Sequence, residues 1–172
     1  MKHFIVIDMQ NDFCYTSKLA NKAAVAIIPN IKKALQKAKA EGMNLIFTHD
    51  SHGEDYLETM EGIKLPFEHC IEGTKGWEIV PELAEETTDE TLYVDKKHFG
   101  FEGWKEFIRP GDEVTICGTC TDICVVSNAL AIKMIDNVEV NVLANCCAGL
   151  NPEAHNAALT VMKNCQCNII EE

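Results

Sequence analysis

Short apolar runs alternate along the chain with longer stretches whose apolar residues recur at helical spacing. The apolar runs predict strands over residues 4–7, 44–48, 92–96, 114–117, 138–143 and 167–170. The helical spacing predicts helices over residues 23–40, 102–108, 122–135 and 152–163. Strands that are apolar throughout and separated by helices indicate a parallel sheet covered on both faces. The pattern therefore predicts an α/β fold, a three-layer α/β/α sandwich with a mostly parallel central sheet.

A long polar segment, residues 49–76, interrupts this alternation, and loops of that length inside a domain are usually functional. In parallel sheets the ligand crevice lies beyond the carboxyl ends of the strands. Asp8 follows the first predicted strand, and the segments 49–52, 96–97 and 118–124 lie at the ends of the next predicted strands. We expect all of them to face one crevice.

The composition is that of one globular domain, with 172 residues of which 47% are hydrophobic and 24% charged. We interpret residues 1–172 as a single domain. The formal net charge of −12 argues against nucleic acid and anionic membranes as partners. The N-terminal apolar run, residues 4–7, is too short for a signal peptide. The sequence therefore predicts a cytoplasmic protein.

Nine cysteines are present, and we interpret most of them as reduced packing residues because several lie in apolar runs. Cys117 and Cys120 form a C-x-x-C pair, which raises the alternative of a dithiol redox protein. That alternative requires an exposed first cysteine. Cys117 ends an apolar strand, so we expect it to be buried.

Cys124 is the cysteine with a different environment. Thr121 or Asp122 is expected to cap the following helix, which would place Cys124 in its first turn. There the unpaired N–H groups and the helix dipole favour a thiolate, and the same N–H groups can hold an oxyanion. A further packing cysteine is the alternative.

Two charged residues at strand ends are further candidates. Asp8 closes the first strand, where a carboxylate can act as a general base or be a solvated turn residue. Period-two alternation places Lys96 on the same face as Leu92 and Val94. A lysine on an apolar face is unusual, whereas Lys97 on the opposite face is expected to be solvated.

The long polar segment contains metal-ligand chemistry. Asp50 and His52 are two residues apart and can point the same way from an extended chain, and His69 follows later. Acidic residues lie between the histidines: Glu54, Asp55, Glu58 and Glu61. Mixed oxygen and nitrogen ligands suit zinc, manganese or iron(II). An acidic loop that contains histidines by chance is the alternative.

These segments, taken in order, resemble the isochorismatase-like cysteine hydrolases, and within them most closely the nicotinamidases. The resemblance rests on four motifs: Asp8-x-Gln10-Asn11-Asp12-Phe13, Asp50-x-His52 with His69, Val94-Asp95-Lys96, and the segment Gly118-Thr119-Cys120-Thr121-Asp122-Ile123-Cys124-Val125. It covers nearly the whole chain. It implies a Rossmann-like three-layer sandwich and selects Lys96 over Lys97.

The resemblance also implies roles for individual residues. Asp8 corresponds to the catalytic acid/base, Lys96 to the catalytic lysine and Cys124 to the nucleophile. The backbone N–H groups of Cys120 and Cys124 correspond to the oxyanion hole, beside a cis Thr119–Cys120 peptide. The metal residues are Asp50, His52 and His69, and for an additional ligand we favour Glu61 over Glu58.

Two departures affect the expected substrate pocket. After Lys96 many members have a Ser-Ala-Phe run, whereas this chain has the segment 98–101. Several nicotinamidases carry a tryptophan shortly before the last metal histidine, whereas this chain has Phe67. Phe13 matches a family aromatic at the substrate, and Phe67 and Phe101 are further pocket candidates.

The function implied is hydrolysis of nicotinamide to nicotinate and ammonia through a thioester, a step of NAD salvage. One divalent metal ion is implied, zinc foremost, with iron or manganese as alternatives. A different small-amide hydrolase of the same superfamily, the dithiol redox protein and a catalytically inactive binding module are the rivals. Family members range from monomers to larger assemblies, so a homo-oligomer stays an open possibility.

Overall fold

A single parallel sheet organises the computed structural model, which describes residues 1–171. Its six strands are β1 (Lys2–Ile7), β2 (Asn44–Asp50), β3 (Leu92–Lys96), β4 (Glu113–Thr119), β5 (Glu139–Ala148) and β6 (Asn168–Ile170). Their order is β3-β2-β1-β4-β5-β6, and every neighbouring pair is parallel. The predicted α/β/α sandwich is confirmed.

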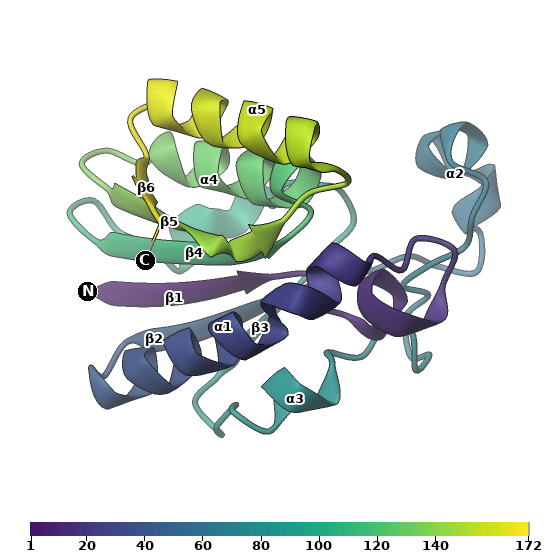
Figure 1. Ribbon diagram of the computed structural model, residues 1–172, viewed down its shortest axis with the longest axis horizontal. Helices are drawn as coiled ribbons and strands as arrows, with labels where there is room; N and C mark the ends of the chain where they lie inside the picture. Colours follow the sequence, from purple (N-terminus) through teal and green to yellow (C-terminus); the bar gives the residue numbers. More distant parts are fainter. Residues whose placement is uncertain (172) are drawn as a thin grey trace.

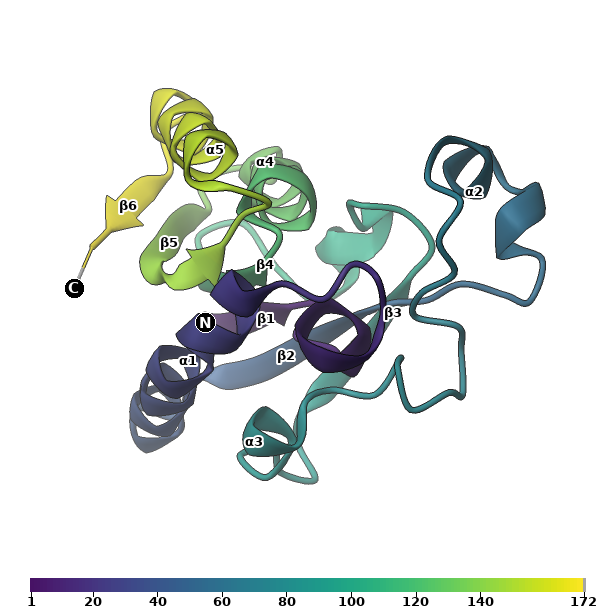
Figure 2. The same cartoon turned by 45° about the vertical axis from the view of Figure 1, so that its right-hand side comes forward.

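Helices cover both faces of the sheet. They are α1 (Lys22–Ala40), α2 (Met60–Lys64), α3 (Pro81–Ala84), α4 (Val126–Lys133) and α5 (Pro152–Asn164). Helices α1 and α3 lie together on one face, and α4 and α5 lie together on the other (Figure 1). Helix α2 belongs to neither layer and stands beyond the carboxyl ends of the strands (Figure 2). No helix within residues 1–171 is long and apolar enough to span a bilayer.

The two long helices begin where the sequence places their caps. The Asn21 side chain accepts a hydrogen bond from Ala23 N at the start of α1. The Asn151 side chain accepts one from Ala154 N at the start of α5. An asparagine oxygen at this position satisfies an N–H group that has no partner within the helix.

Several predicted boundaries were wrong. Strand β2 continues through His49 and Asp50, and the segment after it contains a 3₁₀ turn (Tyr56–Glu58) as well as α2 rather than only loop. The predicted helix 102–108 is a 3₁₀ turn, Glu102–Glu106. Helix α3 was missed, because a four-residue helix is too short to show helical spacing.

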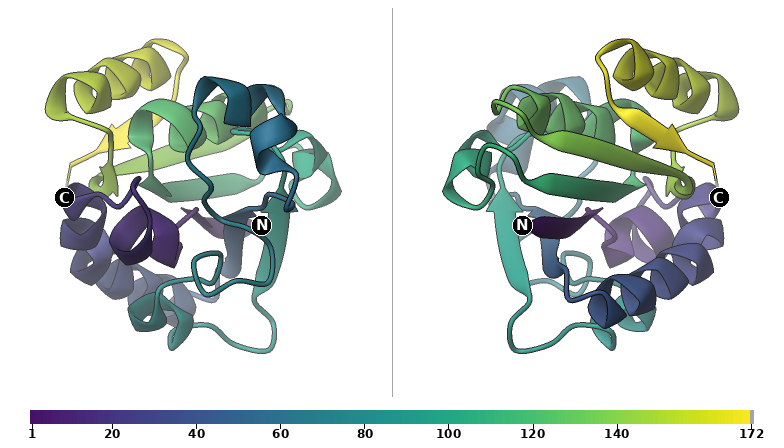
Figure 3. Two further views of the ribbon diagram at one scale, coloured as in Figure 1. Left: turned by 90° about the vertical axis from the view of Figure 1, so that its right-hand side faces the viewer. Right: turned by 90° about the vertical axis from the view of Figure 1, so that its left-hand side faces the viewer.

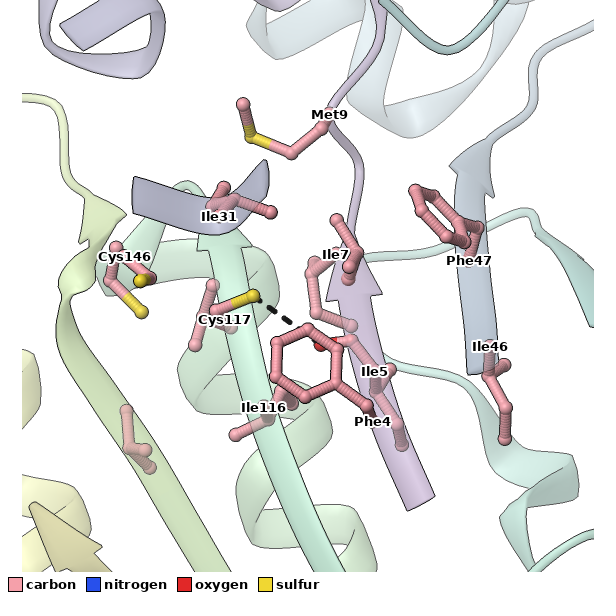
Figure 4. Close-up of a cluster of buried hydrophobic side chains, with 14 of the residues drawn as sticks. Phe4, Ile5, Ile7, Met9, Ile31, Ile46, Phe47, Ile116, Cys117 and Cys146 are labelled. Atoms are coloured by element: carbon pink, nitrogen blue, oxygen red, sulfur yellow. Dashed lines mark hydrogen bonds between the residues drawn. The ribbon is translucent and has the colours of Figure 1, made fainter. Parts of the chain in front are cut away.

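The core is centred on β1, which lies in the middle of the sheet. Ile5, Val6 and Ile7 are fully buried. Figure 4 shows Ile5 and Ile7 beside Ile116 and Cys117 of β4. The Cys117 thiol donates to the Ile5 carbonyl at 3.8 Å. All nine cysteines are free, and Cys117 is buried as expected.

Candidate active site

Lys96, the last residue of β3, connects the charged groups at the carboxyl end of the sheet. Its Nζ lies 2.6 Å from Asp8 Oδ2, 3.3 Å from Asp50 Oδ1 and 3.7 Å from Cys124 Sγ. It also donates to the His98 carbonyl at 3.3 Å. The Lys96 side chain is fully buried, so its ammonium depends on these partners in place of water.

The sheet itself places Asp8 in this group. Asp8 follows β1 with φ of +48°, and its backbone N–H donates to Thr48 Oγ1 at 3.1 Å. The Thr48 hydroxyl in turn donates to Asp8 Oδ1 at 2.6 Å. Thr48 belongs to the neighbouring strand β2, so it orients the carboxylate from across the sheet. Sequence reasoning missed this threonine, which no local spacing links to Asp8.

A glycine allows the segment before Cys124 to approach β1. Gly118 has φ of +122°, and a Cβ built at this position would lie 2.2 Å from the Ile7 carbonyl oxygen. Any larger residue would therefore push β4 away from β1. The cis Thr119–Cys120 peptide follows directly.

Cys124 lies in a π-helical turn, Thr121–Val125, that precedes α4. The expected cap by Thr121 or Asp122 was wrong. The Thr121 hydroxyl pairs with His155 Nδ1 at 2.8 Å, and Asp122 Oδ1 accepts from Leu150 N at 3.0 Å. Both side chains therefore hold the turn against the region of α5, and no side chain caps it.

Burial and close charges set the protonation of the three groups. Burial raises the pKa of Asp8, opposed by Lys96 and reinforced by Asp50. Burial and the Asp8 carboxylate raise the pKa of Cys124, which Lys96 opposes. Burial lowers the pKa of Lys96, but its anionic neighbours outweigh this and the net shift is upward. The lysine therefore stays charged, and Asp8 has the increased proton affinity that suits a general base.

A second cluster adjoins the first through Asp50. One ligand atom from each of four residues lies within 4.8 Å of the others: Asp50, His52, Glu61 and His69. Asp50 Oδ2 is 3.0 Å from His52 Nε2 and 3.5 Å from His69 Nε2. Glu61 Oε1, from α2, is 3.8 Å from each of these nitrogens. Glu58 is not a member of this group.

The surroundings of this cluster fit a divalent metal. Two imidazoles and two carboxylates form a donor set typical of zinc, manganese or iron(II). His69 Nδ1 donates to the Phe67 carbonyl at 2.7 Å, which fixes the ring and directs Nε2 toward the cluster. Burial raises the pKa of Asp50, but hydrogen bonds from His52 and His69 outweigh it and lower it overall.

Two residues that sequence reasoning missed contact the candidate metal ligands and orient them. The buried Tyr56 ring lies 4.7 Å from the His52 ring and 5.0 Å from the His69 ring. The Gln10 amide accepts from Asp50 N at 2.8 Å and donates to Asp50 O at 2.9 Å. Gln10 was noticed only as part of a motif, and Tyr56 carried no signal in the sequence.

The three expected pocket aromatics do not lie together. The Phe13 ring is 5.6 Å from the His69 ring, at the metal cluster. Phe67 is more exposed, with the Lys18 ammonium 5.0 Å from its ring. Phe101 packs edge-on against Trp104 at 5.3 Å. Of the three, Phe13 is the one with a ring contact to a candidate metal residue.

A cleft of about 450 Å³ opens beside the metal cluster. Its lining includes Ser51, His52, Thr59, Glu61, Lys97 and His98. Lys97 is exposed and pairs with Glu72 at 3.2 Å, in contrast to the buried Lys96. The period-two alternation predicted that Lys96 shares an apolar face with Leu92 and Val94. Val94 is buried as predicted, but Leu92 is exposed at the start of this edge strand.

The fold and this arrangement agree with comparisons to known proteins. The chain belongs to the isochorismatase family, whose domain model matches residues 2–172. A curated relative, the nicotinamidase/pyrazinamidase of Mycobacterium tuberculosis, is 28% identical, and the match covers 99% of this chain and 98% of the relative. The resemblance inferred from the four motifs is confirmed.

Solved structures of similar proteins point to the same branch of the family. The pyrazinamidase/nicotinamidase from Streptococcus mutans is 30% identical with a TM-score of 0.86, covering 99% of this chain and 100% of that one. The pyrazinamidase of Pyrococcus horikoshii, solved in complex with zinc, is 28% identical with a TM-score of 0.83 and covers 99% of both chains.

Proposed function

We propose that residues 1–172 form a single hydrolase domain that converts nicotinamide to nicotinate and ammonia. The observation that carries this proposal is the position of the Lys96 ammonium, which contacts Asp8, Cys124 and Asp50 together. A nucleophile and a metal cluster are thereby joined through one buried side chain. We propose that a small aromatic amide binds with its carboxamide at the sulfur and its ring at the cluster.

The relatives support this substrate class, since those at 28–30% identity are named for nicotinamide and pyrazinamide hydrolysis. Nicotinate production would place the protein in NAD salvage, and we propose a cytoplasmic location for it. We expect the enzyme to hydrolyse pyrazinamide, the related pyrazine amide, as well.

The first half of the reaction forms a thioester. Asp8 takes the thiol proton of Cys124, and Lys96 stabilises the thiolate that results. The sulfur attacks the carboxamide carbon, and the backbone N–H groups of Cys120 and Cys124 stabilise the oxyanion. Asp8 then returns the proton to the nitrogen, the C–N bond breaks and ammonia leaves.

The second half releases the acid. Asp8, again a carboxylate, accepts a proton from water as the water oxygen attacks the thioester carbon. The C–S bond breaks and the sulfur recovers the proton from Asp8, so that nicotinate leaves and the enzyme is restored. The raised pKa of Asp8 suits both directions of proton transfer.

Asp50, His52, His69 and Glu61 are the residues that would hold the metal ion, and we propose zinc. When bound, the ion supplies a Lewis-acidic position for the pyridine nitrogen. The residues of this chain then orient the ring relative to Cys124, and orientation of this kind can supply a large part of the barrier reduction.

The rivals are less well supported. The candidate metal cluster of four residues argues against a hydrolase for other small amides. A dithiol redox protein needs an accessible Cys117, but that thiol is fully buried and its pKa is raised well above its ordinary value by burial.

Ammonia release from nicotinamide tests the proposal. Wild-type protein restored with zinc is expected to turn over, and chelated protein to lose most of its activity. Cys124→Ala is expected to lower kcat by about 10⁴-fold or more. Cys165→Ala, which removes an exposed cysteine at the end of α5, is the matched control and should keep full activity. Substantial turnover by Cys124→Ala would refute the nucleophile, and no turnover by the zinc-restored wild type would refute the substrate.

A further inference from the structure

Asn128 is a fully buried polar residue of α4 that the mechanism does not use. Its Oδ1 accepts from Phe101 N at 2.9 Å and from Trp104 Nε1 at 3.0 Å. Its Nδ2 donates to the Phe99 carbonyl at 2.9 Å and to the Cys124 carbonyl at 2.8 Å. The amide thus makes all four hydrogen bonds that its two lone pairs and two N–H groups allow.

These four bonds connect the two segments that carry the reacting groups. One is the turn of Cys124, which lies one helical turn before Asn128. The other is the segment after β3, where the Lys96 ammonium donates to the His98 carbonyl. Asn128 therefore bonds both to the Cys124 carbonyl and to Phe99, the residue after His98.

We propose that Asn128 is a positioning residue that fixes the Lys96 ammonium relative to the Cys124 sulfur. The inference rests on the proposed function, because it assigns the effect to a reaction at that sulfur. Lys96 and Cys124 come from a strand and a turn 28 residues apart, and Lys96 Nζ approaches the sulfur at 3.7 Å. A directional, fully satisfied amide holds such a distance better than apolar packing, which tolerates sliding.

The Asn128→Thr variant keeps the bond to the Cys124 carbonyl and removes the bonds to the segment after Lys96. A threonine hydroxyl can still donate to the carbonyl four residues earlier, that of Cys124. It cannot reach the segment from Phe99 to Trp104, so the connection to Lys96 is lost. Ser127→Ala is the matched control, because Ser127 Oγ donates to the Ile123 carbonyl in the same turn at 2.6 Å and has no bond to that segment.

The first readout is steady-state kinetics on nicotinamide with variants shown to be folded by thermal unfolding. Asn128→Thr is expected to lower kcat by about 10- to 100-fold with KM changed by less than about threefold, because misplacement affects the reacting atoms. Ser127→Ala should stay within about threefold of wild type in both constants. Equal effects of the two variants would overturn the proposal in favour of general loosening of the turn.

The second readout needs no substrate and remains informative if the proposed function fails. Iodoacetamide modification of Cys124 is followed by peptide mass spectrometry, with the exposed Cys165 as internal reference. Asn128→Thr is expected to slow Cys124 alkylation by about tenfold, because the thiolate loses its ammonium neighbour. An unchanged or faster rate would overturn the proposal even if nicotinamide is hydrolysed.

A second variant covers the case in which Asn128→Thr does not fold. Asn128→Asp keeps the size and both acceptor contacts but presents oxygen to the Phe99 and Cys124 carbonyls. It is expected to show the same loss of kcat and the same slower alkylation. If both variants are unfolded at 25 °C, Asn128 has a structural role and the positioning role is wrong.

Discussion

The two ends of the parallel sheet each bury an aspartate, and the two carboxyl groups have opposite properties. At the carboxyl end, Asp8 faces Lys96, and burial raises its pKa. At the amino end, Asp112 is bonded to the N-terminal ammonium, to His3 Nε2 at 3.1 Å and to Arg109 N at 2.8 Å. The ammonium bond, the backbone bond and His3 lower the pKa of Asp112 to about 2 against the effect of burial. Figure 3 views the molecule from these two ends.

The difference shows that the balance between burial and the surrounding charges sets the direction of a carboxyl pKa shift, since both aspartates accept hydrogen bonds. Asp112 receives donors at both oxygens, so its negative charge is stabilised and it serves the fold. Asp8 is completely buried and lies near the second carboxylate, Asp50, so its charge is costly despite Lys96. A buried carboxyl group with a raised pKa is suited to exchanging protons.

Within this comparison, the largest expected effect is on the reaction rate at the carboxyl end. Asp8→Asn should lower kcat by about 10³-fold, because it removes the group proposed to accept the thiol proton. Its free energy of unfolding should also fall, by about 3 kcal/mol, because the buried Lys96 ammonium keeps Asp50 as its remaining carboxylate partner. Kinetics and urea unfolding measure the two quantities. Asp95→Asn, an exposed position on the same strand as Lys96, is the control, and a comparable rate loss there would contradict the assignment.

A smaller effect is expected at the candidate metal cluster, which also lies at the carboxyl end of the sheet. Glu61→Gln should weaken metal binding by about 10- to 100-fold, because it removes one of four converging donors. Glu58→Gln, three residues earlier and outside the cluster, should bind metal like wild type. Competition with a chelator of known affinity measures both variants. Equal affinity of the two would show that α2 contributes no ligand.

At the amino end a substitution is expected to change stability without changing the rate. Asp112→Asn should lower the free energy of unfolding by about 1–2 kcal/mol, because it weakens hydrogen bonds to charged and backbone donors. Its kcat should equal that of wild type. Glu113→Gln, which affects the exposed pair with Lys2, should cost less than about 1 kcal/mol and serves as the control. A change in kcat for Asp112→Asn would break the division between the two ends.

The smallest expected effect is a pH dependence. The pKa of Asp112 is lowered in the folded protein to about 2, below the ordinary value of about 4 in the unfolded chain. Its stabilisation is therefore complete above about pH 5 and is lost as the pH falls toward 2. The difference in unfolding free energy between wild type and Asp112→Asn should shrink over that interval. A difference that is constant from pH 7 to pH 3 would contradict the ionic role of Asp112.

Much of the site followed from residue type and position along the chain. Asp8 and Lys96 lie at the ends of apolar runs, and parallel strands bring such ends to one edge. The choice of Glu61 over Glu58 as the additional ligand had little support in the sequence, because both are glutamates in the same polar segment. Only the short helix α2 distinguishes them, by placing Glu61 Oε1 3.8 Å from both histidines.

Other features depended on partners that no local pattern reveals. Thr121 and Asp122 have the chemistry of helix caps, yet His155 and Leu150 use those side chains from more than 25 residues away. Asn128 reads as an ordinary polar residue of a helix. Its proposed positioning role rests on bonds to residues 99, 101 and 104, which lie beside it only after folding.

The sequence by itself determined the alternation of strands and helices, the edge at which chemistry would gather and the residue types able to perform it. These properties depend on local periodicity and on the fixed direction of parallel strands. The tertiary structure alone decided which carboxyl group has its pKa raised by burial, which glutamate reaches the histidines and which amide connects the Cys124 turn to the segment after Lys96. Such choices depend on distances of a few ångströms between remote segments, and on the water that their packing excludes.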